Sequence, residues 1–410
     1  MRSVPARKIR MAATAVVVAL LGVSSLSSQA AAAGISETPD ETWQTNGRVR
    51  TIVYAGSSVF LGGDFTQVRD SGGGPPVNRR YAAAFDAVTG SVLPWDPDPN
   101  NKLWALEASP DGSTIYMGGD FTTVAGESRS RLAAVDAVGG IPTPWNPTVG
   151  GKVQAILVSP EGSTVYIGGY FTKVNGVARN RVAALLTATP TLVDTFKPSF
   201  KQVSGTCPPV CTPMVASLAF SADATGLYVG GHFSLANDVS RKNGAEISLA
   251  DGSLLPWDPS PYGGKSGGKL YCIAVGSSKV YITGDWWSIR GVRSPNMGAV
   301  DPITGLKDTS FVASTDGGSP ACALSDSLFY VGGHFTLAGG DWAKYTGASR
   351  DKLVAFDADT GEVDPWDPGA NSVLGVHAMA LGVGHLAAGG DFTIIGGRSQ
   401  QGFAQFSGAP

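Results

Sequence analysis

The stretch Gly62-Gly-Asp-Phe-Thr66 decides the fold, because it returns along the whole chain. Complete or altered copies start at Gly118, Gly168, Gly230, Thr283, Gly332 and Gly389. Successive starts lie between 49 and 62 residues apart. A repeat of this length is typical of an array of similar supersecondary units.

The residues around each copy predict strands. An alternating apolar run such as 113–117 leads into the double glycine, and the tight-turn sequence Ser109-Pro-Asp-Gly112 precedes that run. About a dozen polar residues then lead to a third apolar run, as at 132–137. A short turn such as Asp86-Ala-Val-Thr-Gly90 delivers a fourth run, which ends in Pro-Trp-Asp-Pro or Pro-Trp-Asn-Pro. Each repeat is therefore expected to form four antiparallel strands.

Seven such units without helical periodicity predict an all-β fold, a seven-bladed β-propeller with four antiparallel strands per blade. The seventh repeat has a third strand over 403–406 and ends before a Pro-Trp strand. The segment Glu41-Thr-Trp43 precedes the first repeat and could supply the missing outer strand. We therefore expect the N-terminal strand to join the last blade and close the ring.

The first 33 residues are predicted to be an export signal. A basic lead with Arg2, Arg7, Lys8 and Arg10 precedes an apolar core over 11–23 and small residues over 30–33. The core is short for a membrane span, although a retained anchor is the alternative. The mature domain, residues 34–410, would then be secreted to the extracellular space.

The charge of the mature segment argues against some partners. It carries 26 basic and 33 acidic residues, because four basic residues and no acidic ones lie in the signal. A net charge of minus seven disfavours nucleic acid or an anionic membrane as partner. We expect a monomer that binds a glycan or an extracellular protein.

The four cysteines suit an oxidising compartment. Cys207 and Cys211 are close enough in sequence to form a local disulfide, and a metal site is less favoured because no second pair lies nearby. Cys272 and Cys322 align with one position of the predicted first strands that holds small residues in the other repeats, namely Thr51, Ala105, Ala155, Ser217 and Ala378. We call this position the small column. Packing alone could account for the two cysteines there. A bond between them would require a Cα separation of about 4.4 to 6.8 Å.

Long connections gather on one side of the predicted scaffold. The second and fourth strands end on the same face, and the long segments 67–81, 197–214, 259–269 and 337–352 all follow them. Turns on the other face are short. Variable loops on one side of a rigid scaffold usually carry binding, so this long-loop face is the expected ligand side.

Two rings of side chains could contact a ligand there. The residue before the small column is predicted to line a central channel, and it varies among Arg50, Trp104, Gln154, Ala216, Tyr271, Ala321 and His377. A mixture of aromatic, basic and amide groups could bind a small polar ligand, with Arg50, Trp104, Gln154, Tyr271 and His377 as the candidate ligand-binding residues. A water-filled channel without ligand is the alternative.

The third position of the repeated phrase forms the other ring. It holds Asp64, Asp120, Tyr170, His232, Asp285, His334 and Asp391. These residues could bind calcium or sugar hydroxyls. Recurrence in every repeat favours a structural role instead, in which each accepts hydrogen bonds from its own turn or the next blade. No metal site and no cofactor is therefore predicted.

Tryptophan recurs at the end of the predicted fourth strand, as Trp95, Trp145, Trp257 and Trp366. An exposed ring of such side chains would suit stacking on sugars. Their recurrence in step with the fold favours a role in the core between blades instead.

Catalytic motifs of familiar enzyme classes do not occur in the chain. The sequence contains neither a Gly-x-Ser-x-Gly elbow nor a His-Glu-x-x-His motif. Catalytic residues therefore remain unknown, and so does whether the protein is an enzyme.

The repeat resembles the delta-60 type. The resemblance rests on Gly-Gly-x-Phe-Thr, on Asn175-Gly176 or Ala125-Gly126, on Arg131 or Arg181, and on the Asp-x-x-Thr-Gly and Pro-Trp-x-Pro segments. It covers nearly the whole mature chain and implies a secreted actinobacterial-type β-propeller protein of uncharacterised function. The fifth repeat departs most, with Thr283-Gly-Asp-Trp-Trp287. The resemblance implies no catalytic residues.

The sequence thus predicts a secreted binding module that recognises a glycan or a surface protein on its long-loop face. The alternatives are an extracellular polysaccharide hydrolase or lyase and a structural protein of the cell envelope. Paired carboxylates beside a pocket would favour the enzyme.

Overall fold

The computed structural model describes residues 34–203, 212–264, 267–340 and 346–408. These residues form strands, turns and extended segments without a helix, so the described chain is all-β. The predicted signal segment 1–33 and the predicted disulfide between Cys207 and Cys211 lie outside the described residues.

Seven antiparallel sheets of three strands follow the repeats. In each sheet the strand that carries the double glycine, or its variant, lies in the middle. The sheets are β2 (Val49–Ala55), β3 (Ser58–Gly63) and β6 (Ala82–Asp86); β7 (Leu103–Ala108), β8 (Thr114–Gly119) and β11 (Leu132–Asp136); β12 (Val153–Val158), β13 (Thr164–Gly169) and β16 (Val182–Leu186); β18 (Met214–Phe220), β19 (Gly226–His232) and β22 (Gly244–Ser248); β24 (Lys269–Val275), β25 (Val280–Asp285) and β28 (Met297–Val300); β29 (Ala321–Leu324), β30 (Leu328–Gly332) and β33 (Leu353–Asp357); and β34 (Val376–Gly382), β35 (His385–Gly390) and β38 (Phe403–Ser407).

Each polar stretch after the double glycine folds back as a short ribbon. The ribbons are β4 (Gln67–Arg69) with β5 (Val77–Asn78), β9 (Thr123–Val124) with β10 (Glu127–Ser128), β14 (Lys173–Val174) with β15 (Val177–Ala178), β20 (Leu235–Ala236) with β21 (Val239–Ser240), β26 (Ser288–Ile289) with β27 (Val292–Arg293), β31 (Leu337–Ala338) with β32 (Ala348–Ser349), and β36 (Ile394–Ile395) with β37 (Arg398–Ser399). Three carry an additional strand, namely β1 (Gln44–Thr45), β17 (Phe200–Lys201) and β23 (Pro261–Tyr262). The segments 67–81 and 337–352, expected to be irregular, therefore contain strand pairs.

The predicted fourth strand is an extended segment that meets the third strand at a single bridge. Phe85 and Val92 form this bridge in the first sheet, and five further sheets contain an equivalent one. The segment leads directly into Pro94, which has no backbone N–H to donate to a ladder. In this repeat the proline therefore limits pairing after the bridge, whereas the third and fifth repeats form a single bridge without a proline directly after it.

The double glycine is required by two close approaches. A Cβ at Gly62 would lie 2.9 Å from the Cβ of Leu103, which belongs to the first strand of the next sheet. A Cβ at Gly63 would lie 2.0 Å from the carbonyl oxygen of Arg48, at the start of its own sheet. The first glycine therefore lets neighbouring sheets pack, and the second lets the chain pass its own first strand.

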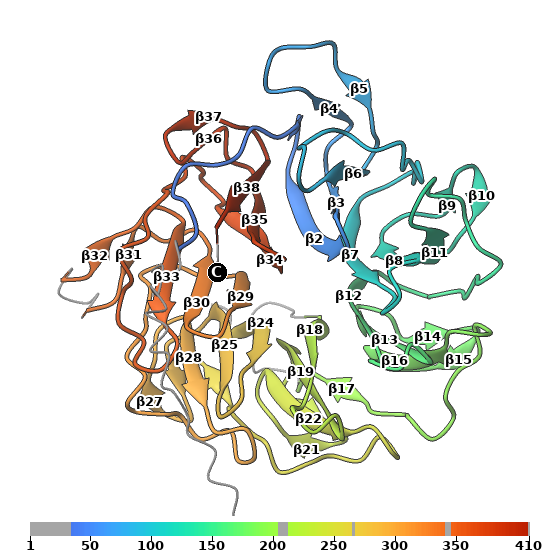
Figure 1. The fold of residues 1–410 in the computed structure, drawn as a ribbon. Coiled ribbons are helices and arrows are strands. Elements are labelled where there is room, and N and C mark those ends of the chain that lie inside the picture. Colours follow the sequence, from blue (N-terminus) through green and yellow to red (C-terminus); the bar gives the residue numbers. More distant parts are fainter. Residues whose placement is uncertain (1–33, 204–211, 265–266, 341–345, 409–410) are drawn as a thin grey trace, which may run out of the picture. The chain divides into compact units, whose positions relative to one another are not determined.

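The same approach links the last sheet to the first. A Cβ at Gly389 would lie 2.6 Å from a methyl group of Val49. The first strands β2, β7, β12, β18, β24, β29 and β34 contact one another in this order, and β34 also contacts β2. Figure 1 shows these strands on the inner side of their sheets.

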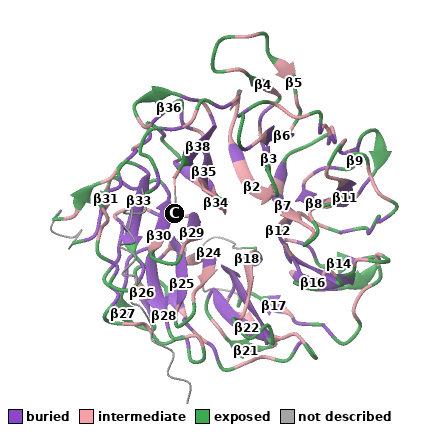
Figure 2. Cartoon of the chain, in the orientation of Figure 1, coloured by how far each residue is buried: buried purple, intermediate pink, exposed green. Residues whose placement is uncertain are grey.

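The core consists of separate apolar layers between neighbouring sheets. One layer joins Phe85 and Leu61 of the first sheet to Phe403 of the last, and another joins Trp145 of the second repeat to Phe171 of the third. The sheet strands are mostly buried, whereas the outer ribbons carry the exposed residues (Figure 2). Each repeat therefore buries its strands only against its neighbours.

The fifth sheet departs from the glycine rule. Thr283 replaces the first glycine and is fully buried. The residue of the next first strand that corresponds to Leu103 is Ser319, which is also fully buried and donates its N–H to Gly284 O. Thr283 is larger than the glycine that it replaces, and Ser319 is smaller than the leucine at the equivalent position. The two changes offset each other, so the volume between the two sheets is preserved.

The N-terminal segment lies beside the last sheet. Ser36 N donates to Ser407 O at 2.9 Å, and Asp40 N donates to Gln405 O at 2.7 Å. We expected Glu41–Trp43 in this place, but Trp43 N instead donates to Gly90 O of the first repeat. The residues that lie beside β38 are thus Ser36 and Asp40, which come before the predicted segment Glu41–Trp43. Residues 36–40 do not form a strand.

Candidate functional site

Six of the seven first strands contain a β-bulge at the same place. In the first sheet Val49 pairs with Gly63 and Thr51 pairs with Gly62, so that Arg50 has no partner in the ladder. The equivalent unpaired residues are Trp104, Gln154, Ala216, Tyr271 and His377. A bulge re-aims the side chain of its extra residue, and all five candidate ligand-binding residues occupy such positions.

These five residues line one pocket of about 840 Å³. The described residues that line it are Arg50, Trp104, Lys152, Gln154, Tyr170, Thr212, Met214, Ala216, His232, Lys269, Tyr271, Asp285, Gly318, Pro320, His334, Val373, Leu374 and His377. The volume lies within the range of about 300–1,000 Å³ that is typical of ligand pockets. The structure therefore brings the predicted binding residues together.

The alignment of the sixth repeat was wrong by one residue. Ala321 pairs with Gly332, as Thr51 pairs with Gly62, so Ala321 belongs to the small column. The residue before it is Pro320, which lines the pocket in the place predicted for Ala321. Cys322 therefore lies outside the small column. The repeat misleads because its first strand shows no shift of register against β30.

Residues at the third position of the phrase form a second layer of the site. Tyr170, His232, Asp285 and His334 line the pocket. Asp64 accepts hydrogen bonds from Arg50 Nε and Nη2 at 2.8 and 2.6 Å, and Asp120 accepts one from Trp104 Nε1 at 2.8 Å. We expected these carboxylates to serve their own turns or the next blade, but they fix the bulge residue of their own sheet.

A stack of cations and aromatic rings extends along one wall. The Arg50 guanidinium lies 4.0 Å from the centre of the Trp104 ring, and Lys152 Nζ lies 3.9 Å from it. Lys152 Nζ is also 5.2 Å from the centre of the Tyr170 ring. Two cations thus lie close to the indole, whose electron-rich ring attracts them.

The local charges change two ionisation equilibria. Burial, together with Arg48 and Arg50, lowers the pKa of His377 to about 4, so that its imidazole is neutral at pH 7. Burial raises the pKa of Asp64, but the hydrogen bond and the positive charge of Arg50 lower it by more, so the pKa of Asp64 lies below its ordinary value. Positive charge therefore predominates around Arg50.

Of the cations that line the pocket, Arg50 was predicted from the sequence and the two lysines were not. Lys152 and Lys269 both line it, each two residues before a bulge residue. Arg48 and Lys102 occupy the same position in the first two repeats. The recurrent pattern of a basic residue, an aliphatic residue and the bulge residue was the signal that could have identified them.

The recurrent tryptophans belong to the core. Trp95 and Trp257 are fully buried, and Trp145 and Trp366 are each 6% exposed. Trp95 Nε1 donates to Asp136 O and Trp145 Nε1 donates to Leu186 O, both in the next sheet. The prediction that these residues stabilise contacts between repeats is confirmed.

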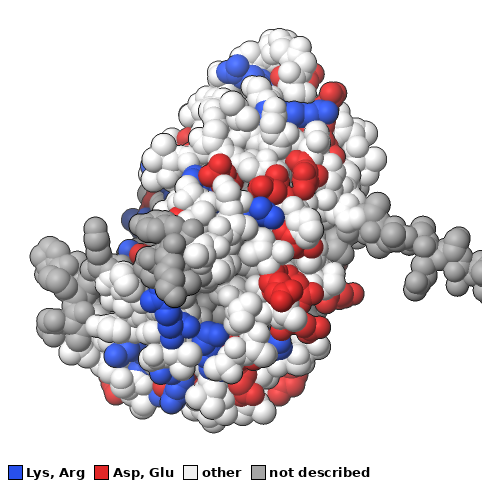
Figure 3. Space-filling view, turned by 90° about the vertical axis from the view of Figure 1, so that its left-hand side faces the viewer, with Lys and Arg blue, Asp and Glu red and all other residues white. Residues whose placement is uncertain are grey.

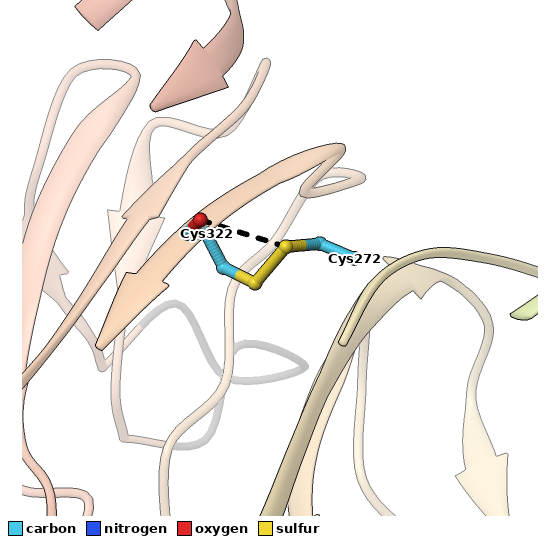
Figure 4. Close-up of a disulfide and its surroundings, with 2 residues drawn as sticks. All are labelled: Cys272 and Cys322. Carbon is cyan, nitrogen blue, oxygen red and sulfur yellow. Dashed lines mark hydrogen bonds between the residues drawn. A yellow bond between two sulfur atoms is a disulfide. The ribbon is translucent and has the colours of Figure 1, made fainter. Parts of the chain in front are cut away.

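Cys272 and Cys322 form a disulfide between neighbouring sheets. Their Cα atoms are 5.9 Å apart, within the range required for the bond. Figure 4 shows the bond between β24 and the adjacent β29, with a close contact from Cys272 Sγ to the Cys322 carbonyl oxygen. Packing alone therefore does not account for this pair. The bond ties the strand of Tyr271 to its neighbour.

The described residues contain no cluster of three or more His, Cys, Asp or Glu side chains able to hold a metal ion. A search of the same residues for helices long and apolar enough to cross a membrane finds none.

Comparisons with known proteins supply little beyond this geometry. The chain matches no family model and no curated protein. Among solved structures it is similar to the computationally designed Ika8 protein, with 13% sequence identity and a TM-score of 0.49. The match covers 91% of this chain and 100% of that one. This likeness is too distant to carry an argument about function.

The half-buried carboxyl of Glu107, which does not line the pocket, should make the free energy of unfolding depend on pH. Burial raises the pKa of Glu107, on β7, from its ordinary 4.5 to about 8, and its carboxyl has no hydrogen bond or ion pair among the described residues. The folded-state pKa lies above the unfolded one, so ionisation destabilises the fold increasingly as pH rises from about 4.5 to 8.

Glu107→Gln should therefore stabilise the protein at pH 9 and have little effect at pH 4. The full difference between the two pKa values corresponds to about 5 kcal/mol, and the partial exposure of Glu107 reduces the expected gain to ~2–3 kcal/mol. Urea unfolding of both proteins at both pH values measures it. Glu161→Gln, in an exposed turn, is the control without a gain at pH 9. An equal effect of Glu107→Gln at both pH values would contradict the prediction.

Proposed function

We propose that this protein is a secreted recognition module that binds an extracellular glycan or surface protein in the pocket at its long-loop face. The observation that carries the proposal is the set of bulge positions. In six of the seven sheets the same backbone bulge places its extra residue at the wall of one cavity. Structural residues of this chain recur from repeat to repeat, as the tryptophans do, whereas these positions vary.

The scaffold proposed is a seven-bladed β-propeller whose ring is closed by the N-terminal segment. Contact of β34 with β2 and the approach of Val49 to Gly389 support closure. Asp40 N bonds the Gln405 carbonyl, as Leu93 N bonds that of Ala84 in the first sheet, which supports an N-terminal contribution to the last blade. In such a ring the first strands surround a central channel, and the pocket is its mouth.

Export is proposed from the N-terminal segment and from the disulfide. Disulfides persist mainly in oxidising compartments, and Cys272–Cys322 is such a bond. Two of the long segments reach the pocket, because Thr212 and Lys269 belong to them. The ligand would therefore meet both the fixed bulge residues and the loops.

A binding screen tests this function. The full chain would be produced with its own N-terminal segment, recovered from the culture medium and applied to cell-wall glycans, secreted polysaccharides and surface proteins, with mass spectrometry of every mixture. We expect binding without new products. Trp104→Ala and Tyr271→Ala should each weaken it at least ~10-fold, a loss of about 1.4 kcal/mol.

The control for this screen is Tyr262→Ala. Tyr262 is 45% exposed and does not line the pocket, so its removal should leave binding unchanged. Shortened or unsaturated products would favour a hydrolase or lyase instead. The absence of any bound component would contradict the proposal and favour a structural role in the envelope.

A further inference from the structure

Charged residues are unevenly distributed between the two ends of the strands. We call the turns between first and second strands and between third strands and fourth segments the turn edge. It contains one basic residue, Lys279, and eleven carboxylates, namely Asp86, Asp111, Asp136, Glu161, Asp223, Asp251, Asp301, Asp326, Asp357, Asp359 and Glu362. In the lower half of the view in Figure 3, basic side chains gather towards the left and acidic ones towards the right.

Several of these carboxylates have a role in their own turns. Asp86 Oδ1 accepts hydrogen bonds from Val88 N and Thr89 N, and Asp136 Oδ1 accepts them from Val138 N and Gly139 N. The negative net charge of the protein therefore originates in the fold of the turn edge. The remainder of residues 34–410 holds 25 basic and 22 acidic residues, so the part that contains the pocket carries an excess of positive charge.

Inside the pocket three cationic groups have donors to spare. Arg50 uses Nε and Nη2 on Asp64, and its Nη1 makes no hydrogen bond among the described residues. Lys152 Nζ lies 3.8 Å from Asp120 Oδ2, beyond hydrogen-bond length, and that oxygen already accepts from Trp104 Nε1. Lys269 makes no side-chain hydrogen bond or ion pair within the described chain. Only one carboxylate, Asp285, belongs to the lining.

The cations also compete with the simplest mode of sugar binding. The Arg50 guanidinium and Lys152 Nζ lie 4.0 and 3.9 Å from the centre of the Trp104 ring, where a stacked sugar ring would have to lie. Trp104 is instead a positioning residue that holds two positive charges at the pocket wall. Tyr170 and Tyr271 each offer a ring and a hydroxyl, and Gln154 an amide, which suits a ligand that carries hydroxyl groups besides its charge.

We propose that the ligand is an acidic polysaccharide whose carboxylates bind Lys152, Lys269 and Arg50 in this pocket. The inference rests on the proposed function and specifies its ligand class. An ammonium or guanidinium group with free donors forms strong hydrogen bonds to a carboxylate when both are partly removed from water. The acidic turn edge would face away from such a chain.

Titration calorimetry with two probes of equal length tests the proposal on the full chain. The probes are hexagalacturonate and the neutral hexasaccharide obtained by reducing its carboxyl groups. We expect the acidic probe to bind at least ~30-fold more tightly in 50 mM salt and to lose most of this preference in 1 M salt, where charges are screened within about 3 Å.

Matched lysine variants locate the contact. Lys152→Gln and Lys269→Gln should each weaken hexagalacturonate binding ~10-fold and leave binding of the neutral probe unchanged. Lys173→Gln removes an exposed lysine that does not line the pocket, and it should change neither. Equal losses for all three variants would show a diffuse charge effect and overturn the proposal.

The remaining outcomes separate this inference from the function on which it rests. Equal or tighter binding of the neutral probe would overturn the acidic ligand and leave a glycan-binding pocket. Failure of hexagalacturonate with binding of a neutral glycan or a surface protein in the screen would overturn the acidic polysaccharide and leave the recognition function. Failure of every component would overturn both proposals.

Discussion

Gly63→Ala should destabilise the protein by at least about 3 kcal/mol, which is the largest single-residue effect that we expect. The new Cβ would lie 2.0 Å from the carbonyl oxygen of Arg48. That oxygen also accepts the N–H of Asp64, so it cannot retreat without loss of a hydrogen bond. Denaturant unfolding followed by tryptophan fluorescence measures the loss.

A matched glycine provides the control for this variant. Gly72 lies in the exposed connection between β4 and β5, and its nearest neighbour to a new Cβ is Asp70 Oδ1 at 3.5 Å. Gly72→Ala should therefore change the free energy of unfolding by no more than ~0.5 kcal/mol. Similar stabilities for the two variants would show that the second glycine of the phrase is not required for packing.

Loss of the Cys272–Cys322 disulfide should have the second largest effect. The bond closes a loop across 50 residues of sequence, and in the chain-entropy model such a loop contributes about 4 kcal/mol by restricting the unfolded state. The double variant Cys272→Ala/Cys322→Ala should lower the denaturation midpoint accordingly. It should also speed local exchange of amide protons in β24 and β29, because the bond joins these two strands.

Reduction of the unaltered protein provides an independent comparison. A phosphine reductant should lower the midpoint of the wild-type protein to that of the double variant. Any effect of the reductant on the double variant would report on Cys207 and Cys211, which the variant retains. Unchanged midpoints in both the reduced protein and the variant would contradict a stabilising role of the bond.

The repeated phrase predicted the sheets because each of its residues answers a local steric need. The double glycine ends the middle strand wherever the chain must pass Arg48 or its equivalents, and sequence periodicity reports such a constraint directly. The fourth strands were overestimated, because alternation in so short a segment does not reveal that pairing stops after a single bridge. The ribbons escaped notice because their strands are only two or three residues long, too short for an alternating pattern to be recognised.

The candidate site was predictable to the extent that it follows the repeat. The bulge residues could be found because one position varied beside a uniform column. The lysines could not be assigned, since only the folded chain brings Lys152 close to the Trp104 ring of the preceding sheet. The disulfide depended on the same kind of distance, which a misaligned repeat obscured.

The bulges also separate recognition from folding. The side chains of the bulge residues line the pocket and take no part in the apolar layers between sheets, so a new side chain there costs the scaffold little. Each sheet with a bulge therefore adds one freely variable position to a shared cavity. A protein built in this way can acquire a different ligand through single substitutions, one repeat at a time, while its core remains the same.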